Sequence, residues 1–169
     1  NDDVIIDETS FYKLISLDAD IVHPLVLDEN MRAIESGAKL LSKYFFFTNH
    51  PFRGLDRDVI PNNKFELIDI FTGRFLVMRP DVIDQLNGIR TDYFLHYGGD
   101  SDFGLRSRRL FKAFVYSGAH ITLNTSTTSN SLKLNVSFVD FTKSLFKFKS
   151  ASNLLVKLRL INLNMPPIS

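Results

Sequence analysis

Two glycines followed by paired carboxylates constrain this chain more than any other stretch. The segment reads Gly98, Gly99, Asp100, Ser101 and Asp102, and it leads into a helix-like run. Glycine permits positive φ and the close approach of a ligand, whereas Ser101 or Asp100 is a suitable N-cap, the residue that begins a helix. The segment is therefore either a capped helix start, which is the plainer interpretation of the spacing alone, or a ligand-binding site.

The composition predicts a single globular domain with a sizeable core. The chain has 169 residues, of which 44% are hydrophobic, and this is enough to bury a core at this length. A net charge of +1 argues against nucleic acid as a partner. The absence of cysteine excludes a disulfide scaffold and a thiolate metal site. No run is long enough to span a bilayer, and we expect a cytoplasmic protein.

Hydrophobic periodicity predicts an α/β fold in which helices flank a mixed sheet. We expect a first helix at residues 8–17 and a second that begins at Pro80 and ends at Asn87 and Gly88. A third helix is expected to begin near Asp100. The strands are expected at residues 19–27, 65–78 and 115–123.

The last part of the chain differs in charge from the rest. Residues 125–131 form a polar linker, and residues 132–169 contain five lysines and Arg159 against one acid, Asp140, which gives a formal charge of +5. We expect a basic amphipathic helical extension here. Residues 132–163 could lie on an anionic membrane surface; a helix packed on the domain with a solvated lysine face is an equal alternative.

Three further segments accompany the glycine and aspartate stretch in a defined order. Asn1, Asp2 and Asp3 open the chain, and residues 71–82 and 112–119 lie on either side of the stretch. Together these segments resemble glycosyltransferase family 2, the GT-A nucleotide-sugar transferases, and particularly its rhamnosyltransferase-like members. The resemblance covers residues 1–124. It implies the C-terminal half of a GT-A-like catalytic domain, incomplete at its N-terminal side, so we expect further residues before Asn1.

The resemblance also implies an activity. Members of the family transfer a sugar from a nucleotide-sugar donor to a saccharide or lipid-linked acceptor, and many act in cell-surface polysaccharide or glycan synthesis. For this chain the resemblance implies an inverting, metal-assisted reaction. An acceptor of this kind is consistent with a peripheral position on the inner face of the cell membrane.

Roles for individual residues follow from the matched positions. Asp100 matches the general base of the family, which takes the proton of the acceptor hydroxyl. Asp2 and Asp3 match the carboxylates that hold a divalent cation, Mg²⁺ or Mn²⁺, for which oxygen ligands are suited. Gly73 matches a glycine that leaves room for the acceptor.

Four more residues are implied in substrate binding. Tyr97 belongs to an aromatic segment that could stack on a sugar ring, and Gly99 stands where the family usually has a glutamate. Asp102 matches a second acid that mainly supports the geometry of the helix start. Arg106 is expected to point outward or toward a phosphate group.

Two other classes of protein remain open on the sequence. Gly99, and the lack of a histidine just after the strand at residues 115–123, are departures from the family pattern. They are compatible with a non-catalytic transferase-like domain that binds carbohydrate or a partner subunit. A phosphoryl-group enzyme that uses paired acids for metal is a second rival, although such enzymes normally show more closely spaced histidine and aspartate ligands.

Overall fold

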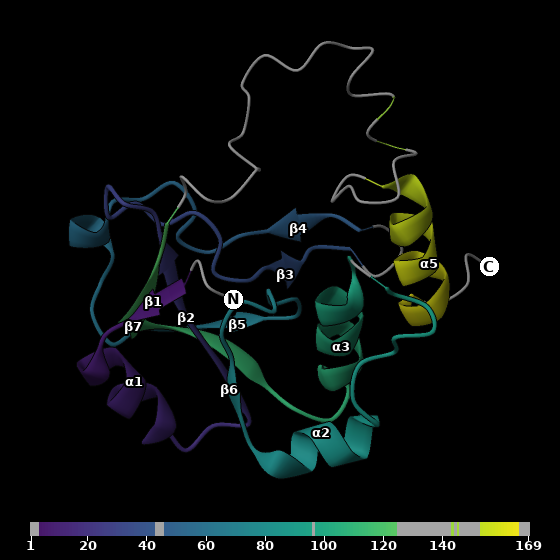
Figure 1. The fold of residues 1–169 in the computed structure, drawn as a ribbon, viewed down its shortest axis with the longest axis horizontal. Coiled ribbons are helices and arrows are strands. Elements are labelled where there is room, and N and C mark those ends of the chain that lie inside the picture. Colours follow the sequence, from purple (N-terminus) through teal and green to yellow (C-terminus); the bar gives the residue numbers. More distant parts are fainter. Residues whose placement is uncertain are drawn as a thin grey trace.

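The computed structural model of the chain has a mixed α/β fold, which confirms the predicted class (Figure 1). The structure describes residues 4–42, 46–95, 97–124, 143, 145 and 153–165. Within these residues a curled mixed sheet is flanked by four α-helices, and a small two-stranded sheet lies beside it. None of the described helices combines the length and the apolar character needed to cross a membrane.

The longest strand, β7 (Ala113–Leu123), organises the main sheet. β2 (Ile21–Leu27) runs parallel along one side of it. On the other side, β5 (Phe65–Ile68) pairs with the first half of β7 and β1 (Val4–Ile6) pairs with the second half, both antiparallel. β6 (Val77–Met78) pairs antiparallel with the beginning of β2 and forms the opposite edge. The strands predicted at residues 19–27 and 115–123 are thus confirmed within two residues of their ends.

All seven residues of β2 are buried, which fits an almost continuous apolar run between two neighbouring strands. Proline is rare in such a strand because it lacks the N–H that the ladder needs. Here the register shifts after Pro24: Pro24 pairs with Tyr116, but Leu25 pairs with His120. The irregularity in the ladder therefore falls where β2 cannot donate a hydrogen bond.

The single long strand predicted at residues 65–78 is wrong. β5 ends at Ile68, a turn occupies residues 73–74, and β6 begins at Val77. β5 pairs with β7, whereas β6 pairs with β2 on the far side of β7. One continuous strand cannot reach both positions, so the chain leaves the sheet and crosses between them.

Two helices confirm their predicted positions. α1 (Glu8–Ile15) is capped by Asp7, whose Oδ1 accepts the Ser10 N–H at 2.8 Å, and it packs against β7. α2 (Pro80–Leu86) begins with Pro80 in its first turn. It ends at Asn87, which adopts a left-handed φ of 53°, followed by Gly88.

The segment between β2 and β5 carries the smaller sheet. β3 (Lys39–Leu40) and β4 (Thr48–Asn49) pair antiparallel, and the short 3-10 helix η1 (Arg57–Val59) follows. The Asp69 carboxylate accepts the Leu40 N–H at 2.8 Å, so β3 is fixed to the end of β5.

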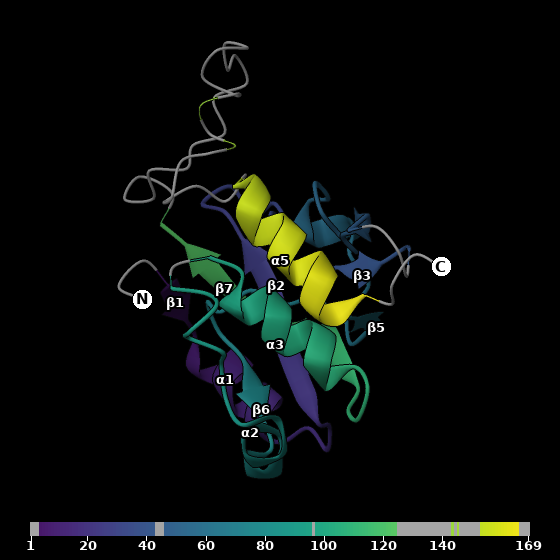
Figure 2. The same ribbon diagram turned by 90° about the vertical axis from the view of Figure 1, so that its right-hand side faces the viewer.

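α3 (Gly99–Ser107) and α5 (Leu154–Asn164) lie side by side at one end of the molecule (Figures 1 and 2). α5 begins at Asn153, whose Oδ1 accepts the Leu155 N–H at 2.9 Å. Residues of both helices belong to one buried hydrophobic cluster, together with residues from earlier in the chain. The members of this cluster are Ala38, Ile70, Phe94, Leu105, Leu160 and Met165. The predicted domain boundary at residue 124 stays a prediction, but α5 shares a core with the residues before it.

Candidate functional site

The N-cap of α3 is Gly98, and not one of the predicted caps, Ser101 or Asp100. Gly98 has a φ of 91°, and a Cβ added there would lie 2.7 Å from Val156 Cγ1 and 3.0 Å from the Phe94 ring. Glycine is therefore required both by the left-handed backbone and by the close packing. This start places Asp100 inside the first turn of α3.

The Asp100 carboxylate is held by two backbone N–H groups. The Ser101 N–H donates to Oδ1 at 2.8 Å, and the Gly73 N–H donates to Oδ2 at 3.0 Å. The positive end of the helix dipole also favours a carboxylate in this turn. Each carboxylate oxygen has two lone pairs, so each keeps an acceptor position after these bonds. Asp100 is half-buried, and a hydroxyl group can approach it from the exposed side.

Gly73 lies in the exposed turn between β5 and β6. A Cβ added at Gly73 would lie 3.7 Å from Asp100 Cβ and 3.9 Å from Asp100 Oδ2. These are ordinary contacts, so the fold itself would accept a side chain here. The structure thus brings together Gly73 and Asp100, two of the residues predicted for the site, and the missing side chain keeps space free beside the carboxylate.

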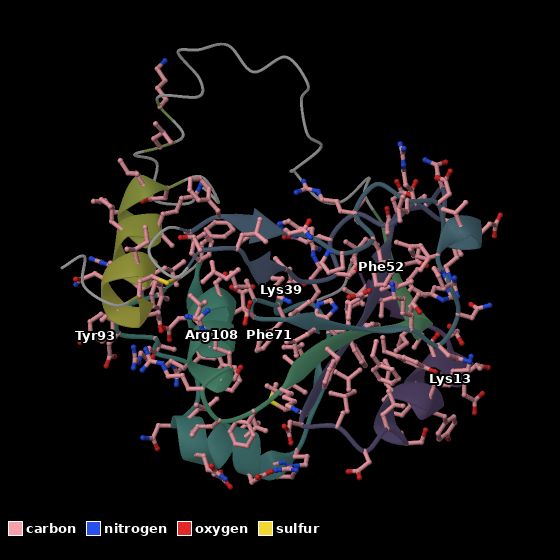
Figure 3. The ribbon with its side chains drawn as sticks, turned by 180° about the vertical axis from the view of Figure 1, so that it is seen from behind. Lys13, Lys39, Phe52, Phe71, Tyr93 and Arg108 are labelled. Atoms are coloured by element: carbon pink, nitrogen blue, oxygen red, sulfur yellow. The ribbon has the colours of Figure 1, made fainter. Side chains whose placement is uncertain are left out.

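Gly99 and Tyr97 lie next to this turn and differ in environment. A Cβ added at Gly99 would lie 3.0 Å from Ile89 Cγ2, so the segment before α3 packs tightly on this glycine. Tyr97 is 38% exposed. Tyr93 and Leu95 in the same segment are also exposed, and Tyr93 is labelled in Figure 3. Exposed aromatic side chains therefore precede the Asp100 turn.

Asp102 and Arg106 form a buried ion pair on another face of α3. Arg106 Nε donates to Asp102 Oδ2 at 2.8 Å, and both residues are buried. Arg106 also donates to the carbonyl oxygens of Leu86, the last residue of α2, and of Gly88, two residues further on. Of the two orientations expected for Arg106, the outward one is wrong, because its guanidinium is buried and links α3 to the end of α2; the orientation toward a phosphate group stays a prediction.

Phe71 fixes the base of the turn that carries Gly73. Its ring lies between the sheet and α3, with its centroid 6.0 Å from that of Phe103 (Figure 3). Gly104 allows α3 to approach this region closely, because an added Cβ would lie only 2.8 Å from the Asp69 carbonyl oxygen. The spacing between Gly73 and Asp100 therefore rests on packed side chains.

A buried histidine behind the turn was not predicted. His23 Nδ1 lies 2.6 Å from the Pro24 carbonyl oxygen, and its Nε2 lies 3.0 Å from Thr72 Oγ1. A carbonyl only accepts, so Nδ1 carries the proton and Nε2 accepts the Thr72 hydroxyl. Burial lowers the pKa of His23 to about 4, which keeps this ring neutral. A histidine inside the apolar run of β2 was the available signal, since such a ring needs a partner for each nitrogen.

The metal ligands predicted from the resemblance, Asp2 and Asp3, lie outside the described residues. Their position relative to Asp100 therefore stays a prediction. In the part of the chain that the structure describes, no three or more His, Asp or Glu side chains are grouped so that they could hold a metal ion.

No protein-family model, curated protein or solved structure matches this chain. The candidate site is consequently defined by the sequence resemblance and by the geometry around Asp100 alone.

Proposed function

We propose that this chain belongs to a glycosyltransferase of the GT-A type that moves a sugar from a nucleotide-sugar donor to a saccharide or lipid-linked acceptor, in cell-surface polysaccharide or glycan synthesis. The observation that carries the proposal is the Asp100 carboxylate. It lies in the first turn of α3, is held by the N–H groups of Gly73 and Ser101, and keeps an acceptor position on each oxygen.

In the proposed reaction Asp100 is the general base. Its carboxylate takes the proton of an acceptor hydroxyl as that oxygen bonds to the anomeric carbon of the donor sugar. The bond from that carbon to the nucleotide diphosphate breaks on the opposite face, so the configuration inverts. The two N–H bonds fix the carboxylate before the acceptor arrives, which lowers the cost of orienting it.

Asp2 and Asp3 would hold Mg²⁺ or Mn²⁺ in this proposal, because carboxylate oxygens are ligands that both ions accept. When bound, the ion would offset the negative charge of the departing diphosphate.

The test is a transfer assay on the natural protein that contains this chain. Release of nucleoside diphosphate is followed with a panel of nucleotide sugars and saccharide acceptors, at saturating concentrations of both. Asp100→Asn should lower turnover by about a hundred- to ten-thousand-fold, because an amide of the same shape cannot take the proton. Asp84→Asn, on the exposed surface of α2, is the matched control. Parental turnover in Asp100→Asn would remove Asp100 from the mechanism.

The C-terminal helix supports peripheral membrane contact as part of this proposal. α5 exposes Leu154, Leu155 and Leu158 on its outward side, and the exposed Lys157 and Arg159 flank them. α5 contains no acidic residue. An apolar stripe bordered by basic side chains suits the surface of an anionic bilayer. Most of residues 132–152 lie outside the described residues, so α5 carries this part of the proposal.

Carbohydrate binding without catalysis is the second candidate. Tyr93 and Tyr97 are 50% and 38% exposed in the segment before Asp100, where their rings are available to stack on a sugar. Saccharide binding that survives in Asp100→Asn, with no transfer by the parent protein, would favour this candidate.

A further inference from the structure

A hollow of about 300 Å³ opens between the ends of α2 and α3. Its size is at the lower end of the range for small-molecule sites, roughly 300–1,000 Å³. The end of α2, the segment after it, the last turn of α3 and the residues just after α3 supply its lining: Gln85, Leu86, Arg90, Arg106, Arg109 and Leu110.

The hollow has an excess of positive charge. Three of its lining residues are arginines, and none is acidic. The carboxylate in contact with them is that of the buried Asp102, which Arg106 approaches to 2.8 Å and Arg90 to 3.5 Å. One carboxylate offsets one of the three guanidinium charges. Like charges placed together repel one another, so an anion in the hollow would relieve a repulsion that the protein alone leaves in place.

The arginines also retain hydrogen-bond donors. A guanidinium has five N–H groups. Among contacts within the described residues, Arg90 uses one of them on Asp102 and Arg109 uses one on the Asn164 carbonyl oxygen. Arg106 is held rigidly by Asp102, Leu86 and Gly88. The hollow therefore presents one fixed guanidinium group, that of Arg106, and two adjustable ones, those of Arg90 and Arg109. The paired N–H groups of a guanidinium match the spacing of the oxygens of a phosphate group.

This hollow is separate from the Asp100 site. Asp100 and Arg106 are six residues apart on α3, so at about 100° per residue their side chains project roughly 120° apart around the helix. The Gly73 turn lies on the Asp100 side, and the end of α2 lies on the Arg106 side.

We propose that the hollow binds a phosphate-bearing small ligand, a phosphomonoester or a diphosphate, through Arg90, Arg106 and Arg109. The guanidinium groups hold the phosphate oxygens, and Leu86 and Leu110 contact the apolar part of the ligand. This inference goes beyond the proposed transfer reaction and does not depend on it.

The test is a titration of the ¹⁵N-labelled full chain with inorganic pyrophosphate and with glucose 1-phosphate at constant ionic strength, and with glucose as the uncharged control. Arginine Nε–H resonances report the site directly. We expect saturable shifts at Arg90, Arg106 and Arg109 with both phosphates and none with glucose. A parallel arm uses vesicles that contain phosphatidic acid. Binding to these vesicles alone would identify a lipid headgroup as the source of the same phosphate chemistry.

Arg90→Gln and Arg109→Gln should each weaken pyrophosphate binding about tenfold or more, because each removes charged hydrogen bonds. Both side chains are exposed, so the variants should fold; Arg106 is left intact because it is part of the buried pair. Arg53→Gln, in an exposed loop, is the control and should bind as the parent does. An unchanged affinity in the double variant Arg90→Gln/Arg109→Gln, or unsaturable shifts spread over all surface arginines, would overturn the proposal.

Discussion

The buried Asp102 carboxylate on α3 accepts a hydrogen bond from Asn164 Nδ2 on α5 at 2.9 Å. The two residues are 62 positions apart in the chain, and both are buried. The bond joins the helix that carries Asp100 to α5, the last helix among the described residues. Since Asp102 also pairs with Arg106, one carboxylate connects α3, α5 and the end of α2.

Asn164→Ala should therefore destabilise the fold by about 1–3 kcal/mol, the usual cost of removing a partner from a buried polar group. Asn162 lies on the exposed side of the same helix, and Asn162→Ala should change the free energy of unfolding by less than about 0.5 kcal/mol. Urea unfolding followed by circular dichroism measures both. Equal stabilities of the two variants would mean that the hydrogen bond does not hold α5 in place.

Local sequence signals predicted the elements that depend on neighbouring residues. The prediction of the buried strand β2 was correct, and so were the predicted start of α2 at Pro80 and its end at Asn87. These signals are local, because the burial pattern, a proline at a helix start and a left-handed residue at a helix end each act within about one turn of the chain. The division of residues 65–78 into β5 and β6 was missed. It depends on which strands the segment pairs with, β7 first and β2 later, and alternation along the segment carries no information about that choice.

In the candidate site, too, the sequence indicated the local features but not the contacts between residues that are distant in the chain. The glycines before α3 indicated a special backbone conformation, and Gly98 has one. The bond from Gly73 to Asp100 joins residues 27 apart, and the bond from Thr72 to His23 joins residues 49 apart. Arg106 was expected to point outward or toward a phosphate group, whereas Asp102 and two carbonyl groups satisfy its guanidinium in the interior.

The buried His23 predicts a loss of stability in mild acid. Burial lowers the pKa of His23 from 6.5 to about 4. Between these two pH values the unfolded chain binds a proton at His23 and the folded chain does not. The free energy of unfolding should fall as the pH decreases from about 6.5 to 4, by up to about 3 kcal/mol from this residue. Burial also lowers the pKa of His50 and of His120, and these contribute in the same direction.

Urea unfolding at a series of pH values measures this slope. His23→Gln cannot titrate and should flatten the decline, even if the variant is less stable at every pH. His120→Gln is the control, because His120 is only half-buried, and it should retain most of the slope. If the stability of His23→Gln declines with pH as steeply as that of the parent, His23 is not the cause of the decline. Asp7 contributes in the same direction but at lower pH: hydrogen bonds with Ser10 lower its pKa, so the stability that it supplies is lost only as the pH falls below about 3.8.

The outward face of α5 predicts binding to anionic vesicles. Leu155 and Leu158 are 58% and 51% exposed, and partial burial of both in a bilayer surface should strengthen binding about tenfold or more. The double variant Leu155→Gln/Leu158→Gln should lose that amount in a co-sedimentation assay with phosphatidylserine vesicles. Leu41→Gln, at a leucine that is 66% exposed far from α5 in sequence, should bind as the parent does. If the parent fails to bind, or the double variant binds equally well, α5 does not contact the membrane.

The space beside Asp100 gives the last prediction. An added Cβ at Gly73 would meet Asp100 only at ordinary contact distances, 3.7 Å to Cβ and 3.9 Å to Oδ2, and Gly73 does not have a positive φ. Gly73→Ala should therefore leave the free energy of unfolding within about 0.5 kcal/mol of the parent. The new methyl group would occupy the room beside the carboxylate that the proposed acceptor needs, so kcat/KM for the acceptor should fall while the KM for the donor stays unchanged.

Gly54→Ala separates this effect from general damage by a new methyl group. Gly54 has a φ of 82° and nothing within 4 Å of an added Cβ, so alanine there strains the backbone without approaching Asp100 and should lower stability. Gly73→Ala is expected to show the opposite pattern, with a stable fold and poor use of the acceptor. A Gly73→Ala variant that is stable and has a parental kcat/KM for the acceptor would show that the acceptor does not pass beside Gly73.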